Sequence, residues 1–352
     1  MRDTIWRLAH VPEKWIPVFR KEHAPMQKKQ SIFRSIRSEY ALAAALALIV
    51  SVQAPAWAQD TLKLAVGQRG NWDTSVSELG QRGGIFKKHG LALELLYTQG
   101  SAETLQAVLS GSVDIGVGAG IMGALGAFSK NAPVRIIGAE TTGAADLFWY
   151  VKADSAIKAL KDTDGKTIAF SGKGSSTDGI VTAFVKQYAL KAVPTATGGP
   201  APTLTQVMSG QIDVGWSAPP FGLDLIDQGK IRIIASGNDA TVFKGQTVRL
   251  LVTNVAALQG RRDVIKRYVQ AYRETVDWEY ADPAALKLYA EWLNIPPAIA
   301  QRSRDGFFPK AALDPDTIVG LSTIVNDAVE LKYTQAPLTQ AQLGELIQIP
   351  AR

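Results

Sequence analysis

The sequence contains no cysteine, which excludes disulfide bonds, thiolate metal sites, a cysteine nucleophile and a lipid-modified cysteine anchor. Histidine is nearly as scarce, because only three occur in 352 residues and only His89 lies beyond residue 58. A Ser-His-Asp triad or a multi-histidine metal site would have to use His89, which follows two lysines in a polar turn. The composition therefore argues against an enzyme of these classes, and we expect neither a metal nor another cofactor.

The greater part of the chain also lacks an excess of either charge. The formal net charge is +6, but residues 1–58 hold nine Lys/Arg and four Asp/Glu, whereas the other 294 residues hold 29 and 28. Most of the excess positive charge therefore lies in the N-terminal segment. A nucleic-acid partner, which would need a basic surface on the globular part, is therefore not expected.

Long apolar runs are missing as well. The most apolar run, 41–52, is shorter than the ~20 residues needed to span a bilayer. Four Lys/Arg precede it between residues 28 and 37, and Ala56-Trp57-Ala58 follows it. A charged region, an apolar region and an Ala-x-Ala site are typical of a secretory signal peptide. We expect residues 1–58 to be a leader cleaved after Ala58 and the mature protein to lie in the periplasm.

What the sequence does contain is one pattern that occurs twice. Residues 105–119 read LQAVLSGSVDIGVGA and residues 204–218 read LTQVMSGQIDVGWSA, with seven of fifteen positions identical at an offset of 99. Each copy predicts a helix that ends at Ser-Gly, followed by a short β-branched strand. A second pair of similar strands follows at 134–137 and 231–234. Shared turn chemistry alone could produce the likeness, but the matching order of elements favours two similar α/β lobes.

Strands alternate with helices along most of the chain, which predicts a mostly parallel sheet in each lobe. Further strands are expected at 62–66, 91–97, 147–151, 165–170 and 247–253, helices at 74–83 and 179–188, and a turn at 85–91. Chain crossings near 143–146 and 244–247 would form a hinge. The predicted organisation is lobe 1 at 59–143 and 247–352, including C-terminal helices, with lobe 2 at 144–246.

The loops at the predicted strand ends are rich in Gly, Ser and Thr at helix starts. Free backbone N–H groups and the helix dipole make such loops suited to an anion, although simple helix capping would use the same residues. The best cases are Gly100-Ser101, Gly118-Ala119-Gly120 and Gly174 to Thr177. Lys173 and Arg69 are candidates to neutralise the anion. The spacing around Lys173 does not match a nucleotide-binding P-loop.

Two tryptophans and two aspartates also stand near the predicted strand ends. Trp72 and Trp216 are either core residues or aromatic walls for a ligand, and we favour the walls because the first copy of the repeat has Val117 where the second has Trp216. Asp114 and Asp213 could suggest catalysis or metal binding. We expect them instead to bond nearby backbone donors.

Several of these motifs together resemble a known family. They are the leader, the turn at 85–91, Gln99-Gly100-Ser101, the Ser-Gly-x-Val-Asp-Ile-Gly repeat, and Gly165-Lys166-Thr167 before the Gly-Ser-Ser loop. Over about residues 60–255 the chain is similar to periplasmic solute-binding proteins of ABC transporters. It most resembles the nitrate/sulfonate/taurine group, which includes riboflavin and thiamine-precursor binders.

The resemblance implies a two-lobed periplasmic-binding-protein fold (type II) that closes on a ligand and docks on permease subunits in the inner membrane. It implies a monomer that binds a small anionic organic solute, and the Trp and Ser/Thr loops suit a sulfonate or an aromatic carboxylate better than nitrate. Lys173 joins the residues that the resemblance implies, because its positive charge could neutralise an anion. The expected ligand-binding residues are Asn71, Trp72, Gly100, Ser101, Ala119, Gly120, Thr141, Thr142, Lys173, Ser175, Ser176, Thr177, Trp216 and Ser217.

Two other functions use the same fold. The eukaryotic synthase of the thiamine pyrimidine resembles this family, but it carries a cysteine-rich iron-site motif and an active-site histidine, and this chain has no cysteine. A periplasmic ligand sensor would use the same cleft and differ only in its docking surface.

Overall fold

The computed structural model describes residues 59–352, so the predicted leader and its cleavage site lie outside the described residues. The described residues form one compact unit. Within the described range, no helix combines the length and apolar character needed to cross a membrane. We keep lobe 1 (59–143 and 247–352) and lobe 2 (144–246) as names for the two regions, whose limits remain those predicted from the sequence.

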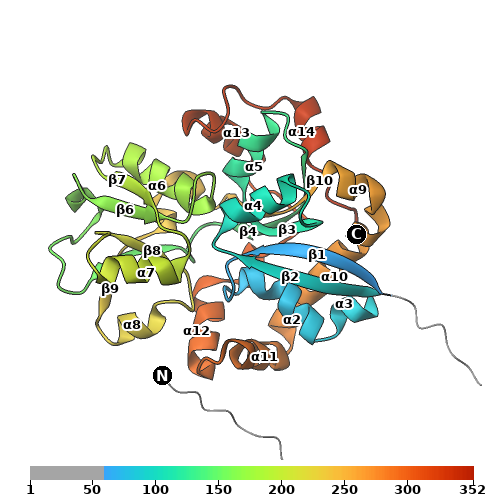
Figure 1. Cartoon of the computed structure of the whole chain (residues 1–352), viewed down its shortest axis with the longest axis horizontal. Coiled ribbons are helices and arrows are strands. Elements are labelled where there is room, and N and C mark those ends of the chain that lie inside the picture. The colour runs from blue at the N-terminus through green and yellow to red at the C-terminus, as the bar shows by residue number, and fades with distance from the viewer. Residues whose placement is uncertain (1–58) are drawn as a thin grey trace, which may run out of the picture. The chain divides into compact units, whose positions relative to one another are not determined.

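Lobe 1 is built on a five-stranded sheet of order β2-β1-β3-β10-β4 (Figure 1). The burial of its strands follows their sequences. At the start of β1, buried and exposed side chains alternate, since Leu62 and Leu64 are buried while Lys63 is exposed. The apolar strand β10 is buried on both faces throughout its length. The elements of its first segment are β1 (Asp60–Gly67), η1 (Asp73–Ser75), α2 (Val76–Arg82), α3 (Ile85–Lys88), β2 (Leu91–Thr98), α4 (Ser101–Leu109), β3 (Ile115–Gly120), α5 (Ile121–Phe128) and β4 (Val134–Thr142).

Lobe 2, green to yellow in Figure 1, contains a three-stranded sheet of order β8-β5-β9 and the pair β6-β7. A parallel bridge between Ile168 and Val214 joins β6 to the start of β8. Its elements are β5 (Phe148–Lys152), η2 (Leu160–Asp162), β6 (Thr167–Phe170), α6 (Ser176–Gln187), β7 (Val193–Ala196), α7 (Pro200–Met208), β8 (Gly215–Ser217), α8 (Leu223–Asp227), β9 (Ile231–Ser236), η3 (Gly237–Asp239) and η4 (Thr241–Phe243).

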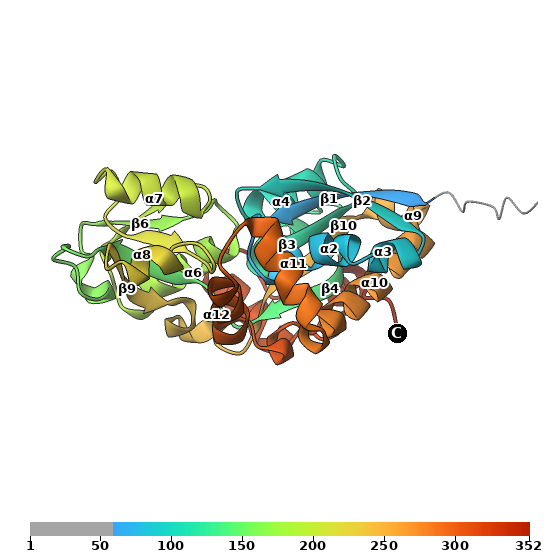
Figure 2. The same cartoon turned by 90° about the horizontal axis from the view of Figure 1, so that it is seen from below.

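The chain then returns to lobe 1 and becomes helical, as predicted. In α10, Ile265, Tyr268, Val269, Tyr272 and Val276 recur at helical spacing and are buried. Figure 2 shows α10, α11 and α12 packed along one side of lobe 1. The elements are β10 (Thr247–Asn254), α9 (Val255–Gly260), α10 (Arg262–Ala281), α11 (Pro283–Leu293), α12 (Pro297–Phe307), η5 (Lys310–Ala312), α13 (Leu321–Glu330) and α14 (Gln340–Leu346).

The predicted strands and helices form, with one difference. The segment at 85–91 is not only a turn, since α3 occupies its first four residues. The sheets are mostly parallel, as expected, and each contains one antiparallel strand. β1 pairs in parallel with β2 and β3, and β6 with β7, but β10 is antiparallel to both its neighbours, as is β5. The physical reason is shared, because β5 and β10 are the first strands after the chain crosses between lobes and enter each sheet from the opposite side.

Candidate functional site

The two chain crossings between the lobes are hydrogen-bonded to each other. Gly143 N, in the first crossing, donates to Gln246 O, in the second crossing, over 2.7 Å. Gly143 has a φ of 81°, which a glycine adopts without strain. The predicted crossings therefore lie side by side and form one two-stranded connection between the lobes.

A buried charge network fixes this connection to the loop after β1. The Arg249 guanidinium, in β10, donates to Asp73 Oδ2 over 2.7 Å and to Asp146 Oδ2 over 2.7 Å. Thr141 Oγ1 donates to the same oxygen of Asp73 over 2.9 Å. All three charged side chains are buried, so each charge depends on its partners. Arg249 thus joins the strand-end loop of lobe 1 to the crossing that leads into lobe 2.

A cavity of about 450 Å³ lies where the two lobes face each other. Lobe 1 contributes the loop after β1 and the end of α11, while lobe 2 contributes β5, the start of α7 and the segment from β8 to β9. Most of the wall is apolar, which suits a small organic molecule. The lining residues are Arg69, Tyr150, Pro200, Ala201, Leu204, Ser217, Pro220, Phe221, Gly222, Asp224, Leu225, Ile231, Leu293 and Ile295.

Among residues 59–352, Arg69 is the only cation that lines the cavity, and aromatic rings hold it in place. Its guanidinium carbon lies 4.7 Å from the ring centre of Trp292 and 6.0 Å from that of Tyr97. One of its nitrogens also donates to Trp292 O over 3.4 Å. A guanidinium has five N–H donors, so this arrangement leaves several available to an anion. The Tyr150 phenol also lines the cavity, and burial raises its pKa, so it stays a neutral hydroxyl.

The serine and glycine loops predicted to receive an anion are brought together, but they contact one another. Ser176 N, at the start of α6, donates to Ser101 Oγ over 3.0 Å, from one lobe to the other. A Cβ placed on Gly120 would lie 2.8 Å from Ser176 N. Ser175 Oγ caps α6 by accepting from Asp178 N. Two of the first N–H groups of α6, those of Ser176 and Asp178, therefore already have partners within the chain.

The other predicted ligand-binding residues lie in the cavity wall, beside the serine loops, at the crossing and near Arg249. Ser217 lines the cavity, and its hydroxyl donates to Phe221 O over 3.0 Å. Ala119, Gly100 and Thr177 are buried beside the serine loops, and Thr142 contacts Thr247 at the crossing. Asn71 is buried beside the Arg249 network, with no hydrogen-bond partner for its Oδ1 among the described residues. The predicted set as a ligand site remains a prediction.

Neither tryptophan lines the cavity. Trp72 has no exposed surface and packs in lobe 1 against Tyr280 and Tyr289, donating from Nε1 to the Tyr280 hydroxyl over 3.0 Å. Trp216 is 3% exposed and donates from Nε1 to Gly198 O over 3.1 Å. In this conformation Trp72 is a core residue, not the expected wall, and Trp216 supports the loop that leads into α7.

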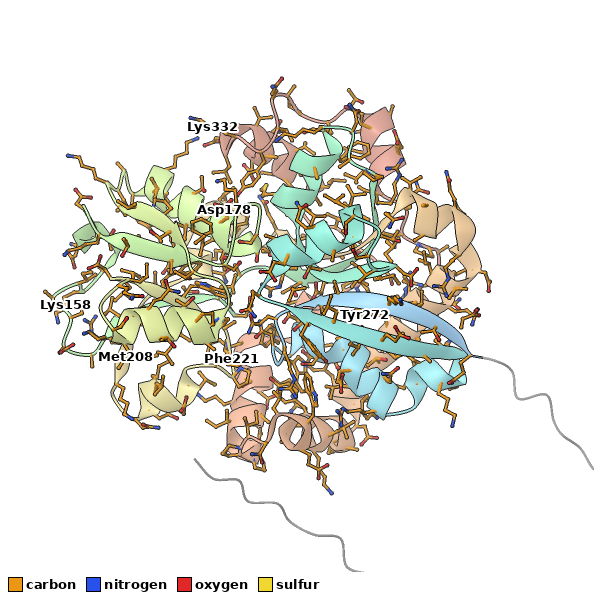
Figure 3. All side chains as sticks on the ribbon, in the orientation of Figure 1. Lys158, Asp178, Met208, Phe221, Tyr272 and Lys332 are labelled. Atoms are coloured by element: carbon orange, nitrogen blue, oxygen red, sulfur yellow. The ribbon has the colours of Figure 1, made fainter. Side chains whose placement is uncertain are left out.

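Lys173 also lies away from the cavity. Its side chain is 82% exposed and pairs with Asp178 over 3.1 Å, and the Tyr333 hydroxyl donates to the same carboxylate over 2.6 Å. Lys173 instead lines a separate hollow beside α4 and α5, together with Lys130 and Lys332. Figure 3 shows Lys332 near the top of the view, Asp178 below it and Phe221 lower still.

The expected structural role of the repeated aspartates is confirmed. Asp114 accepts a hydrogen bond from Lys63 N over 2.8 Å, and Asp213 accepts one from Thr167 N over 2.9 Å. Asp114 thereby ties the first repeat to β1, and Asp213 ties the second repeat to β6. Among residues 59–352, no group of three or more His, Asp or Glu side chains is placed to hold a metal ion.

Sequence reasoning missed most of the cavity wall. Pro200 and Ala201 start α7, a few residues before the second repeat, and Phe221 follows that repeat by three residues, so the repeat was a nearby signal for all three. Leu293 and Ile295 come from the C-terminal helices. Nothing near them in the sequence connects them with a site formed by residues 69 and 150–231.

Lobe 1 also contains carboxyl groups without charged partners. Glu279 is fully buried, and neither of its oxygens has a hydrogen-bond partner among the described residues. Burial, with the nearby Asp73 charge, raises its pKa well above the usual range. Burial raises the pKa of Glu140 in the same way. Burial therefore favours the neutral form of these two carboxyl groups, and neither of them lines the cavity.

The comparisons with known proteins agree with this architecture. The family model described as NMT1/THI5 like matches residues 78–286. The alkanesulfonate-binding protein of Xanthomonas axonopodis pv. citri, solved bound to MOPS, is similar with a TM-score of 0.67, at 19% identity over 83% of this chain and 100% of that chain. The periplasmic nitrate-binding protein of Synechocystis PCC 6803 gives a TM-score of 0.63, at 13% identity over 82% and 86% of the two chains.

One curated relative is named as an enzyme and not as a binding protein. The 4-amino-5-hydroxymethyl-2-methylpyrimidine phosphate synthase of Aspergillus parasiticus is 23% identical over 235 residues, which are 62% of this chain and 66% of that protein, just under two thirds. The solved structures show the periplasmic-binding-protein fold, as expected. The family match covers more than half of the chain, and the protein belongs to the NMT1/THI5-like family.

Proposed function

We propose that the protein is the solute-binding component of an ABC import system. It captures a small anionic organic solute between its lobes and delivers it to permease subunits in the inner membrane. The observation that carries this proposal is the apolar cavity between the lobes with Arg69 at its wall. The solved binding proteins with the same fold, which include an alkanesulfonate binder, support it.

The cavity chemistry narrows the solute. Its single guanidinium suits a sulfonate or carboxylate, and its apolar wall suits a hydrocarbon or aromatic body attached to that group. Phe221 and Leu293 face that body from opposite lobes. Nitrate has no apolar part to fill the remaining space, so it is the weaker candidate. Taurine-like sulfonates and aromatic carboxylates remain the favoured classes.

A ligand screen by thermal unfolding tests the proposal. Alkanesulfonates, taurine, nitrate, aromatic carboxylates and vitamins are each added to the purified protein. A ligand at a hundred times its Kd stabilises the folded state by about 2.7 kcal/mol, which raises the unfolding midpoint. Arg69→Gln should abolish the shift given by the best anion. Arg262→Gln is the matched control, because Arg262 is exposed and outside the cavity. No shift with any anion would overturn the proposal.

The remaining features of the proposal follow from the same class of protein. We infer a periplasmic monomer that binds no nucleic acid. Mass determination of the exported protein would test cleavage after Ala58, and light scattering would test the monomer. An intact leader or a stable dimer would contradict the respective inference.

The similarity to the synthase favours one second candidate, an enzyme like the synthase of the thiamine pyrimidine. The one histidine among residues 59–352, His89, pairs with Glu274 over 2.8 Å, and neither residue lines the cavity. Mass spectrometry of the bound ligand before and after prolonged incubation distinguishes the two functions. An unchanged ligand supports the binding protein, whereas a new product would establish an enzyme.

A further inference from the structure

The cavity carries one charge of each sign, and the two come from different lobes. Arg69 follows β1 in lobe 1, and Asp224 lies in the first turn of α8 in lobe 2. The other twelve lining residues are uncharged. Closing the lobes around a ligand therefore places it between a guanidinium and a carboxylate.

Neither charge is neutralised by a side chain in the part of the protein that the structure describes. Within residues 59–352, Arg69 and Asp224 form no ion pair with each other or with another side chain, whereas Asp227, three residues after Asp224, pairs with Arg302 of α12 over 2.7 Å. The two acids of α8 thus have different surroundings. Asp227 bridges the lobes outside the cavity, and Asp224 faces the cavity with its charge available.

The wall between the two charges is apolar. Leu204 and Phe221 of lobe 2, with Leu293 and Ile295 of lobe 1, contribute hydrocarbon surface to the same cavity. Arg69 and Asp224 are both exposed to solvent. A purely anionic ligand bound at Arg69 would leave the Asp224 carboxylate without a partner and would gain no attraction from it. A ligand with a second, positive group would instead be attracted at both ends.

We propose that the solute is a zwitterion, with an anionic group at Arg69, an amine at Asp224 and an apolar spacer between them. The proposal rests on the proposed function and specifies its ligand class. The competing explanation of Asp224 is local, because an acid in the first turn of a helix is favoured by the helix dipole. That explanation predicts no effect of Asp224 on ligand choice.

Calorimetric titration with three ligands of equal chain length separates the explanations. The probes are hexanesulfonate, hexylamine and aminohexanesulfonate, which carry an anion, a cation and both. We expect aminohexanesulfonate to bind wild-type protein about tenfold more tightly than hexanesulfonate, the ratio given by one favourable charge pair worth ~1.4 kcal/mol. Hexylamine should bind most weakly.

Two variants sharpen the test. Asp224→Asn keeps the shape of the side chain and should remove the tenfold preference by weakening aminohexanesulfonate and not hexanesulfonate. Asp154→Asn is the matched control, since Asp154 is an exposed acid of lobe 2 outside the cavity, and it should leave the preference unchanged. Unfolding midpoints without ligand report whether each variant is folded.

The outcomes of the titrations distinguish a zwitterionic ligand from a purely anionic one. A preference for aminohexanesulfonate that Asp224→Asn abolishes supports the zwitterion. Hexanesulfonate binding as tightly as aminohexanesulfonate, or an unchanged preference in folded Asp224→Asn, would overturn the zwitterion and leave the anion-binding proposal standing. Failure of all three probes to bind at Arg69 would count against both proposals.

Discussion

The two lobes share one plan and differ in what fills it. Lobe 1 has the strand order β2-β1-β3-β10-β4, and lobe 2, through its parallel bridge, has β7-β6-β8-β5-β9. Each strand of one lobe has a counterpart at the same place in the other. In both, the fourth strand is the antiparallel one that follows a crossing. The sequence repeat is the visible part of a duplicated architecture.

The fourth strands show the difference. In β10 of lobe 1, Arg249 is buried between two carboxylates, whereas β5 of lobe 2 holds Phe148, Trp149 and Tyr150. Buried charges hold lobe 1 to the crossing, and aromatic packing fills lobe 2. The fourth strand of the same strand order therefore accepts either a buried, ion-paired arginine or a row of aromatic side chains. Substitutions can test whether the two lobes depend on these different interactions.

The largest effect is expected from Arg249→Met. The substitution leaves Asp73 and Asp146 buried without their cation, which should lower the free energy of unfolding by about 3–5 kcal/mol. Urea denaturation measures the loss. Arg232→Met in lobe 2 is the control, since that guanidinium donates only to two carbonyls. Equal losses in the two variants would remove the distinction between the lobes.

The buried acids of lobe 1 predict a dependence on pH. The pKa of Glu279 is raised in the folded state, so folding takes up a proton at any pH between its ordinary value near 4.3 and the raised pKa. Over that interval stability should fall as pH rises, by up to ~1.4 kcal/mol per pH unit. Glu279→Gln should remove this slope, so the variant gains stability relative to wild type at pH 8 and less at pH 5. A constant difference between pH 5 and 8 would show that Glu279 is ionised when folded.

The repeated glycines test the likeness of the lobes. A Cβ on Gly116 would lie 2.8 Å from Val108, and one on Gly215 would lie 2.7 Å from Val207 and 2.6 Å from the Tyr150 ring. Each glycine makes room for the equivalent valine of its own repeat. Gly116→Ala and Gly215→Ala should each cost about 1–3 kcal/mol in thermal or urea unfolding. Adding Val108→Ala or Val207→Ala to the matching variant should recover part of the loss. Tolerance of alanine at only one site would break the equivalence.

The smallest effect is expected at the repeated aspartates. Asp114→Asn and Asp213→Asn keep an acceptor for the backbone N–H of Lys63 or Thr167 but lose the charge. Each should cost about 1 kcal/mol of unfolding free energy. Ligand affinity should not change in either variant. A loss of binding with unchanged stability would restore the functional interpretation of these residues.

Much of this architecture could be predicted from local pattern. The repeat, the echoed strands at 134–137 and 231–234, and the crossings all depend on short-range signals, and each agrees with the strands observed. Strand direction could not be predicted in the same way. Whether β5 and β10 run parallel to their neighbours depends on the side from which the chain enters the lobe, and no residue within them encodes that.

The functional site was harder to predict from the sequence than the fold, for a related reason. Trp72 and Trp216 stand near strand ends as expected, but only packing decides that one indole enters the core and the other supports Gly198. Leu293 and Ile295 reach the cavity because α11 packs on lobe 1 beside the loop after β1. Such contacts join residues more than 200 positions apart in sequence, and a single sequence contains no signal for them.

A crystal structure grown with hexanesulfonate tests the central claim most directly, because it separates the cavity from the serine loops as the ligand site. We predict the sulfonate within hydrogen-bond distance of the Arg69 guanidinium and its carbon chain between Phe221 and Leu293. A sulfonate bound instead between Ser101 and Ser176, with those two residues drawn apart, would contradict the assignment of the cavity.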